Sequence, residues 1–185
     1  MSILTKELPE YIVIDGKEHR IKTDFKIWLE FSEIVGSGEL TPERIVKIFK
    51  IVFFELPPNM LKALKVVFEF YSHSEKTEKK EKAEKKVFDF EYDADIIFAS
   101  FMQQYKLDLT EVELHWWKFL NLFQNLSEDT KFMEVVKYRS IRLSDIKDKK
   151  QKKFYAKMKK LYSLPDNRNQ AQKENDLISA FEKIF

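Results

Sequence analysis

Four carboxylates alternate along the segment DFEYDAD near the middle of the chain, and they are the first candidates for metal chemistry. Their spacing resembles the first half of a calcium-binding loop: Asp89, Glu91, Asp93 and Asp95. An EF-hand loop also needs glycine at its sixth position and glutamate at its twelfth, where this chain has Ala94 and Ser100. We therefore interpret the acids as residues at the start of a helix, where negative charge complements the helix dipole.

The histidines are the next candidates, for a metal site or for acid–base catalysis. His19, His73 and His115 have no partner at metal-ligand spacing, and HWWKF does not match the zinc motif H-E-x-x-H. The sequence contains no cysteine, so disulfides and thiolate ligands are excluded. It also lacks a nucleophile motif such as G-x-S-x-G. We predict a protein that is not an enzyme and has no catalytic residue, metal or cofactor.

A basic segment at 142–160 could bind an anion, because nine Lys or Arg stand there against two Asp. Interleaved aromatic residues would suit a nucleic-acid-binding regulator, in which lysines neutralise phosphates. The other interpretation is a surface helix whose lysines face water while Phe154, Met158 and Leu161 pack inward. The nearly balanced net charge of +2 favours this second interpretation, so nucleic acid is the alternative function here.

Two adjacent tryptophans stand in the segment HWWKFLNLFQNLSEDTKF, residues 115–132. Neighbouring residues on a helix point about 100° apart, so the two rings cannot share one face. Four apolar residues lie within about 60° of Trp116, which makes it a core residue: Val112, Phe119, Leu120 and Phe123. Trp117 lies at the margin of this apolar face. It either covers the edge of the core or binds a partner, as Trp does in many interfaces.

The elements that position these residues follow from periodicity and turn chemistry. Asp15-Gly16, between apolar residues, predicts a β-hairpin, and the hairpin needs helices against one face. Helical spacing follows from Phe25 to Ile34, and Thr41-Pro42 marks the next helix start. Pro57-Pro58 is expected to end that helix and to open a third one with one apolar face: Leu61, Leu64, Val67, Phe68 and Tyr71.

The second half of the chain predicts further helices. One begins near Tyr92, and a capping box formed by Thr110 and Glu113 precedes the tryptophan-rich helix. Ser127 is expected to cap a helix that ends near Ser140, and the basic segment forms another.

Composition and segment boundaries place these elements in a mainly α-helical, compact multi-helix domain. The 185 residues are 44% hydrophobic, with 17 Phe, and 35% charged, as expected of a soluble globular protein. We expect the hairpin and first helices in 1–73, a charged Lys/Glu connector in 74–86, and the tryptophan-rich part of the same domain in 87–165. The connector is either mobile or a solvated helix extension.

The last part, 166–185, reads as a polar linker and a short amphipathic helix. Five apolar residues recur at helical spacing: Leu177, Ile178, Phe181, Ile184 and Phe185. A helix of about ten residues is unstable alone in water, so this stripe must pack on something. It either closes over its own domain or docks on a partner. The latter makes its residues, with Trp117, our partner-binding candidates.

Three segments of the chain together resemble a phage protein family: IDGKEHRIKTDFKIWLEFSEI, HWWKFLNLFQNLSEDTKFMEVVKYRS and FYAKMKKLYSLP. The family is known as bacteriophage gene product fifteen, from siphophages and prophages of Gram-positive bacteria. The resemblance runs from about Leu4 to Pro165. It implies a tail assembly chaperone, because genes of this family typically lie between those for the major tail protein and the tape-measure protein.

The resemblance also implies partners and a location. The expected partners are the tape-measure protein and the tail-tube protein, and the tape-measure protein is one possible binding partner of the C-terminal helix. A homo-oligomer is also possible. The chain shows no secretory signal and no apolar stretch long enough to span a membrane. We therefore expect a protein of the host cytoplasm that is absent from the mature virion.

Overall fold

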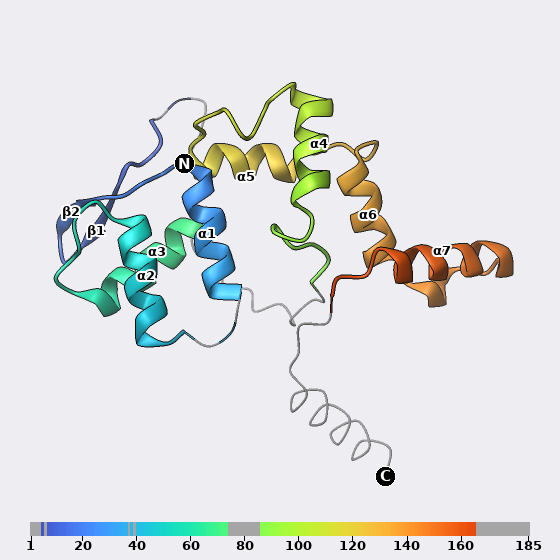
Figure 1. Ribbon diagram of the computed structural model, residues 1–185, viewed down its shortest axis with the longest axis horizontal. Coiled ribbons are helices and arrows are strands. Elements are labelled where there is room, and N and C mark those ends of the chain that lie inside the picture. Colours follow the sequence, from blue (N-terminus) through green and yellow to red (C-terminus); the bar gives the residue numbers. More distant parts are fainter. Residues whose placement is uncertain (1–4, 6, 37, 39, 74–85, 166–185) are drawn as a thin grey trace, which may run out of the picture. The chain divides into compact units, whose positions relative to one another are not determined.

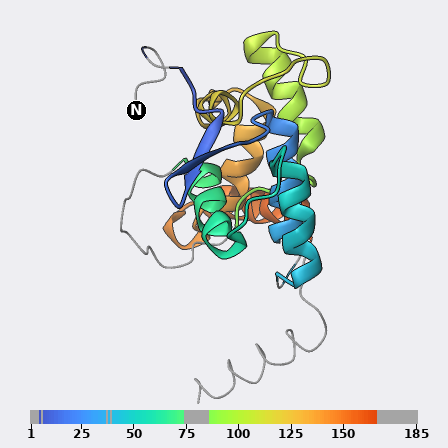
Figure 2. The same cartoon turned by 90° about the vertical axis from the view of Figure 1, so that its left-hand side faces the viewer.

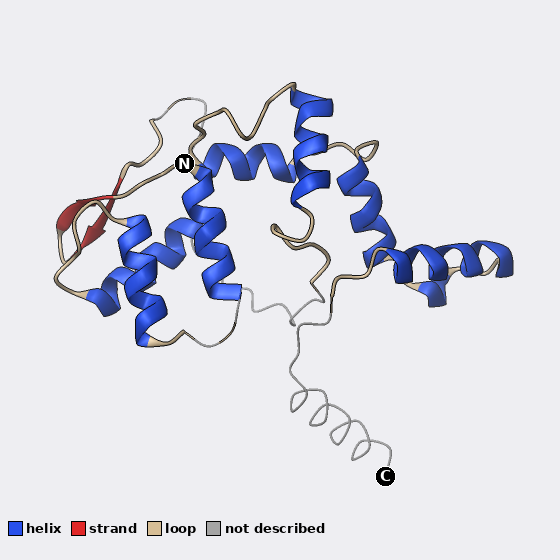
Figure 3. Ribbon diagram, viewed as in Figure 1, coloured by secondary structure: helices blue, strands red, loops and turns tan. Residues whose placement is uncertain are grey.

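The computed structural model describes residues 5, 7–36, 38, 40–73 and 86–165. The predicted connector, apart from the exposed Lys86, and the predicted C-terminal helix lie outside these residues. The described chain contains the following elements: β1 (Tyr11–Ile14), β2 (Lys17–Arg20), α1 (Phe25–Gly36), α2 (Pro42–Val52), α3 (Met60–Ser72), α4 (Ala94–Tyr105), α5 (Trp116–Gln124), α6 (Lys131–Ser140), a short 3-10 helix (Leu143–Asp145) and α7 (Lys149–Leu161). Helices dominate and the only strands in these ranges form one hairpin (Figure 3), so the mainly α class is confirmed.

The chain divides into two compact units, which we describe separately. Unit 1 comprises residues up to Lys137, and unit 2 begins at Tyr138. The boundary falls within α6 and therefore inside the range 87–165, which the sequence analysis took as part of a single domain.

The hairpin at the front of unit 1 forms as its turn dipeptide predicts. Asp15 and Gly16 both have positive φ angles, 50° and 76°, which match the right-handed twist of the paired strands. Tyr11 pairs with Arg20 and Ile14 with Lys17. Along β1 the side chains alternate between exposed and buried, so one face packs on the core, and β1 contacts α3 (Figures 1 and 2).

The predicted start of α2 is confirmed, but its predicted end at Pro57 is wrong. Thr41 is its N-cap, with Pro42 in the first turn. The helix ends at Val52, however, several residues before Pro57, because the chain becomes extended at Phe53. The next helix is capped by Asn59, whose side-chain oxygen accepts a hydrogen bond from the Lys62 N–H at 3.2 Å.

Two caps expected in the second half are wrong. Thr110 donates its hydroxyl to Asp108 at 2.6 Å and lies in a turn, and α5 begins only at Trp116. Ser127 similarly donates to Asp129, and α6 begins at Lys131 after Thr130, whose hydroxyl accepts from the Met133 N–H at 3.4 Å. In both places a neighbouring aspartate engages the hydroxyl of the predicted cap.

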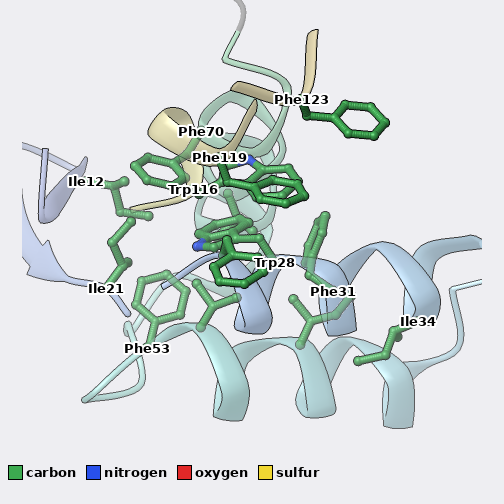
Figure 4. Close-up of a cluster of buried hydrophobic side chains, with 14 of the residues drawn as sticks. Ile12, Ile21, Trp28, Phe31, Ile34, Phe53, Phe70, Trp116, Phe119 and Phe123 are labelled. Carbon is green, nitrogen blue, oxygen red and sulfur yellow. The ribbon is translucent and has the colours of Figure 1, made fainter. Parts of the chain in front are cut away.

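The core of unit 1 is built largely from aromatic side chains of α1, α3 and α5 (Figure 4). Phe25 and Phe119 stack with their ring centroids 4.8 Å apart, and Trp28 lies 4.6 Å from Phe70. Because α1 and α3 precede residues 74–85 while α5 follows them, this core joins the two sequence segments of unit 1.

Candidate partner-binding surfaces

Trp116 is a core residue, as its position on the helix predicted. Its side chain is fully buried, and its ring stacks on Tyr71 with centroids 5.3 Å apart. The indole N–H donates a hydrogen bond to the Tyr71 carbonyl at 2.8 Å. A buried Trp needs such a partner for its polar atom, so the ring is held by both packing and a directional bond.

Trp117 occupies the margin of the core. It is half-buried, and its ring stacks on Phe70 at 5.0 Å and lies 4.2 Å from His73. Its indole N–H donates to the Phe70 carbonyl at 2.9 Å. Its donor is therefore used within the chain, and only the exposed part of the ring remains for a partner. Partner binding by Trp117 stays a prediction.

The two tryptophans together cap the C-terminal end of α3. The last carbonyls of a helix have no intrahelical N–H partner and must be satisfied by other groups. Phe70 and Tyr71 lie in the last turn of α3, and the adjacent indoles bond their two successive carbonyls. The side-by-side placement that looks unusual on one helix thus matches two neighbouring acceptors on another. Sequence reasoning missed this role.

His115 holds the start of α5. Its Nδ1 accepts a hydrogen bond from the Trp117 N–H at 3.1 Å, so its Nε2 carries the proton and donates to the Pro9 carbonyl at 3.1 Å. Burial lowers the pKa of His115 below 6.5, and this outweighs the opposing effect of the Pro9 carbonyl. The neutral imidazole is therefore the form that caps the helix.

Two of the four alternating carboxylates accept hydrogen bonds from backbone N–H groups. Asp89 accepts the N–H groups of Glu91 and Tyr92, at 3.0 and 2.9 Å, while the Asp93 carboxylate accepts the Asp89 N–H at 3.0 Å. Burial opposes ionisation of Asp89, but the Lys86 ammonium and these N–H groups lower its pKa. Among the described residues, no group of three or more His, Cys, Asp or Glu could hold a metal ion. The absence of a metal requirement stays a prediction.

A surface that the sequence analysis missed lies between α2 and α3. We define the proline-loop surface by four exposed apolar side chains around Pro57-Pro58: Phe54, Leu56, Met60 and Leu61. Leu61 is 84% exposed, so its expected place on the inner face of α3 is wrong. The sequence signal was the run FELPPNML, in which apolar residues flank two prolines outside any periodic pattern.

The hairpin anchors both ends of this loop. Phe53 forms an isolated bridge with Ile21 at the base of the hairpin. At the other end, Asn59 donates to the Asp15 carboxylate at 3.0 Å and Lys62 forms an ion pair with it. The hydrogen bond from Lys62 lowers the pKa of Asp15 most, and the hydrogen bond from Asn59 lowers it further. The exposed apolar side chains therefore lie on a loop with two fixed ends and on the first turn of α3.

A hollow of about 340 Å³ lies beside this loop, between β1 and α3. Its four charged lining residues form two pairs: Lys62 with Asp15, and Lys65 with Glu69 at 3.9 Å. It therefore directs no unpaired charge toward a small-molecule ligand.

In unit 2, α7 presents apolar and basic side chains together. Phe154 is 49% and Leu161 64% exposed, so the expectation that both pack inward is wrong. Only four residues of α7 are half-buried: Tyr155, Ala156, Met158 and Lys159. Few described elements of unit 2 are present to cover the helix.

None of the helices in the described ranges combines the length and the apolar character needed to cross a bilayer.

Comparison with known proteins identifies the family. No curated protein and no solved structure matches the chain significantly. A family model described as "Bacteriophage Gp15 protein" matches residues 4–164, a span that includes the tryptophan pair, the proline-loop surface and α7. Because this match spans most of the sequence, the chain belongs to the Bacteriophage Gp15 protein family.

Proposed function

We propose that this protein is a non-catalytic tail assembly chaperone, which binds the tape-measure protein and helps to recruit tail-tube subunits. Membership of the phage family is the observation that carries the proposal. On this proposal the protein acts in the host cytoplasm and leaves before the virion is complete.

The exposed apolar groups support a holding role. A protein that keeps a long helical chain soluble needs apolar side chains to contact it and charges around them to stay soluble itself. The proline-loop surface supplies the first property in unit 1, and charged residues border it: Arg20 lies 5.0 Å from the Phe54 ring, and Lys62 follows Leu61.

Co-expression with the tape-measure protein of the same phage tests the proposal. We expect the tape-measure protein to stay soluble and to co-purify with this chain, and to aggregate when expressed alone. A tape-measure protein that is soluble alone and does not co-purify would refute the proposal. Detection of the chain in purified virions at tail-protein stoichiometry would show a structural tail component instead.

Substitution of Leu61 would locate the binding surface. Because its side chain is 84% exposed, Leu61→Ser should leave the fold intact while it weakens co-purification. Lys65→Ser, on the same helix and also exposed, is the matched control that removes no apolar group. Equal binding by the two variants would exclude the proline-loop surface as the contact.

One observation favours a second candidate, a nucleic-acid-binding regulator. The lysines of α7 are largely exposed and form no ion pair with a described residue. Retention on a random DNA duplex that falls steeply with salt would support this candidate, because phosphate contacts release counterions. Retention that is absent at low salt would exclude it.

A further inference from the structure

The exposed face of α7 carries a short apolar seam. Phe154, Met158 and Leu161 are spaced by four and three residues and therefore lie along one side of the helix. Phe154 and Leu161 are about half or more exposed, and the only aromatic neighbours of the Phe154 ring are Tyr138 and Tyr155 within the described part of unit 2. No described residue covers the seam as a whole.

The seam is bordered by positive charge. Residues 138–165 contain ten Lys or Arg and two Asp, which gives this segment a net charge of +8 in a chain whose total is +2. Lys150 and Lys157 lie within about 60° of Phe154 around the helix, and both are exposed. A ligand of this face should therefore combine apolar side chains with flanking carboxylates.

The segment 176–185 of the same chain has this chemistry. On a helix, its apolar residues form one stripe centred near Phe181, as described above. Glu182 falls beside that stripe, next to Ile178, whereas Lys183 falls on the opposite side. The edge of the stripe is thus acidic where the edge of the α7 seam is basic.

The chain between the two segments is long enough to join them. Residues 166–175 can span up to about 33–36 Å when extended, whereas the 13 residues of α7 measure about 20 Å. The segment can therefore reach any part of the seam from the end of α7. The family match ends at residue 164, so the segment lies beyond the part of the chain that the family shares.

We propose that residues 176–185 dock in cis, as a short amphipathic helix, on the seam formed by Phe154, Met158 and Leu161. The apolar stripe covers the seam, and Glu182 lies near the lysines that border it. Docking also supplies the packing without which a helix of this length does not form in water. This inference goes beyond the proposed function and does not depend on it.

Cross-linking in the full-length chain tests the docking, because the sequence has no native cysteine to interfere. Cysteines are introduced as Gln151→Cys, on the edge of the seam away from Lys150 and Lys157, and Ala180→Cys, on the edge of the stripe away from Glu182, and a short bismaleimide is added. The matched control combines Ala180→Cys with Lys149→Cys, an exposed position on the opposite side of α7. We expect an intramolecular product that forms several-fold faster with Gln151→Cys, at a rate independent of protein concentration.

The other outcomes overturn the proposal. Equal rates for the two pairs would show that the segment has no preferred face on α7. A cross-linked dimer whose yield rises with protein concentration would show that the segment docks on a second copy instead.

Amide hydrogen exchange gives an independent test in the full chain without cross-linker. The double variant Phe181→Ser and Ile184→Ser should exchange several-fold faster over residues 149–161 than the wild type. Ser179→Ala, on the opposite side of the predicted stripe, is the control and should leave the exchange unchanged. Unchanged exchange in the double variant would overturn the proposal, whatever the result with the tape-measure protein.

Discussion

Residues 25–137 and residues 138–165 use the same kinds of side chain in opposite ways. The first region buries its rings: Trp28, Phe31, Phe49, Phe101 and Trp116 are almost wholly shielded from water. In the described part of the second region no apolar side chain is fully buried, although Tyr138 and Tyr162 stack on each other at 5.7 Å.

The difference lies in what surrounds each helix. Both α5 and α7 carry an apolar stripe, but α5 packs against α1 and the end of α3, whereas within the described part of unit 2 the neighbours of α7 are short elements such as the 3-10 helix. Apolar residues at helical spacing therefore predict a helix. The number of neighbouring elements decides whether those residues become part of a core. Substitutions in the two regions test this contrast.

The largest effect is expected at Trp116. Truncation by Trp116→Ala removes a fully buried ring and the bond to the Tyr71 carbonyl, so we expect a loss of about 3–5 kcal/mol in the free energy of unfolding. Chemical denaturation measures this loss. The same truncation at Phe154, Phe154→Ala, made in a chain that lacks residues 176–185 so that the ring stays exposed, is the comparison. A similar loss there would remove the contrast between the two regions.

Trp117 should rank second, and two substitutions separate its contributions. We expect Trp117→Ala to cost roughly 1–3 kcal/mol, clearly less than Trp116→Ala, because the ring is only half-buried. Trp117→Phe keeps most of the stacking on Phe70 but removes the indole donor, and should cost about 0.5–1.5 kcal/mol. If Trp117→Phe is as stable as the wild type, the capping of α3 by Trp117 contributes nothing.

His115 should make unit 1 sensitive to pH. Its pKa is lowered in the folded state, chiefly by burial, so the unfolded chain binds the proton more readily. The contribution of neutral His115 to stability is complete above the ordinary pKa of 6.5 and is lost as pH falls below it toward the lowered value.

Melting temperature against pH measures the His115 effect, with His115→Asn as the control. Asparagine can cap a helix but does not titrate. We expect the melting temperature of the wild type to fall more steeply below pH 6.5 than that of the variant. Parallel curves would show that the helix cap is insensitive to protonation.

The smallest effect, and one of opposite sign, is expected in α7. Lys153 is flanked at four residues by Lys149 and Lys157, so Lys153→Glu replaces two repulsive pairs with attractive ones. We expect a gain of roughly 0.2–0.5 kcal/mol per pair at low salt, seen as slower amide exchange in α7. Lys153→Gln should give an intermediate result, and high salt should reduce the differences.

The sequence predicted features that depend on local geometry. The hairpin follows from Asp15-Gly16 because the turn requires two positive φ angles, and the start of α2 follows from Thr41-Pro42. The burial of Trp116 follows from the spacing of apolar residues around it.

The remaining features depend on residues distant in the sequence. Thr110 and Glu113 match a capping box, but Asp108 binds the threonine hydroxyl and His115 starts the helix. The capping of α3 by two indoles joins positions 45 and 47 residues apart, which no local pattern encodes. Likewise, the exposure of Leu61 and Phe154 depends on which elements lie nearby, and periodicity alone does not reveal that.

The bonds from the two indoles to the end of α3 have a consequence for chain connectivity. With the stacking of Phe25 on Phe119, they join residues 1–73 to residues 86–137 without using the peptide bonds between them. A protease that cuts within 74–85 should therefore leave two fragments that co-elute as one folded particle, and the separated fragments should reassemble on mixing. New termini could be opened at the same place, which would make this stretch the natural point for a circular permutant or an inserted reporter domain.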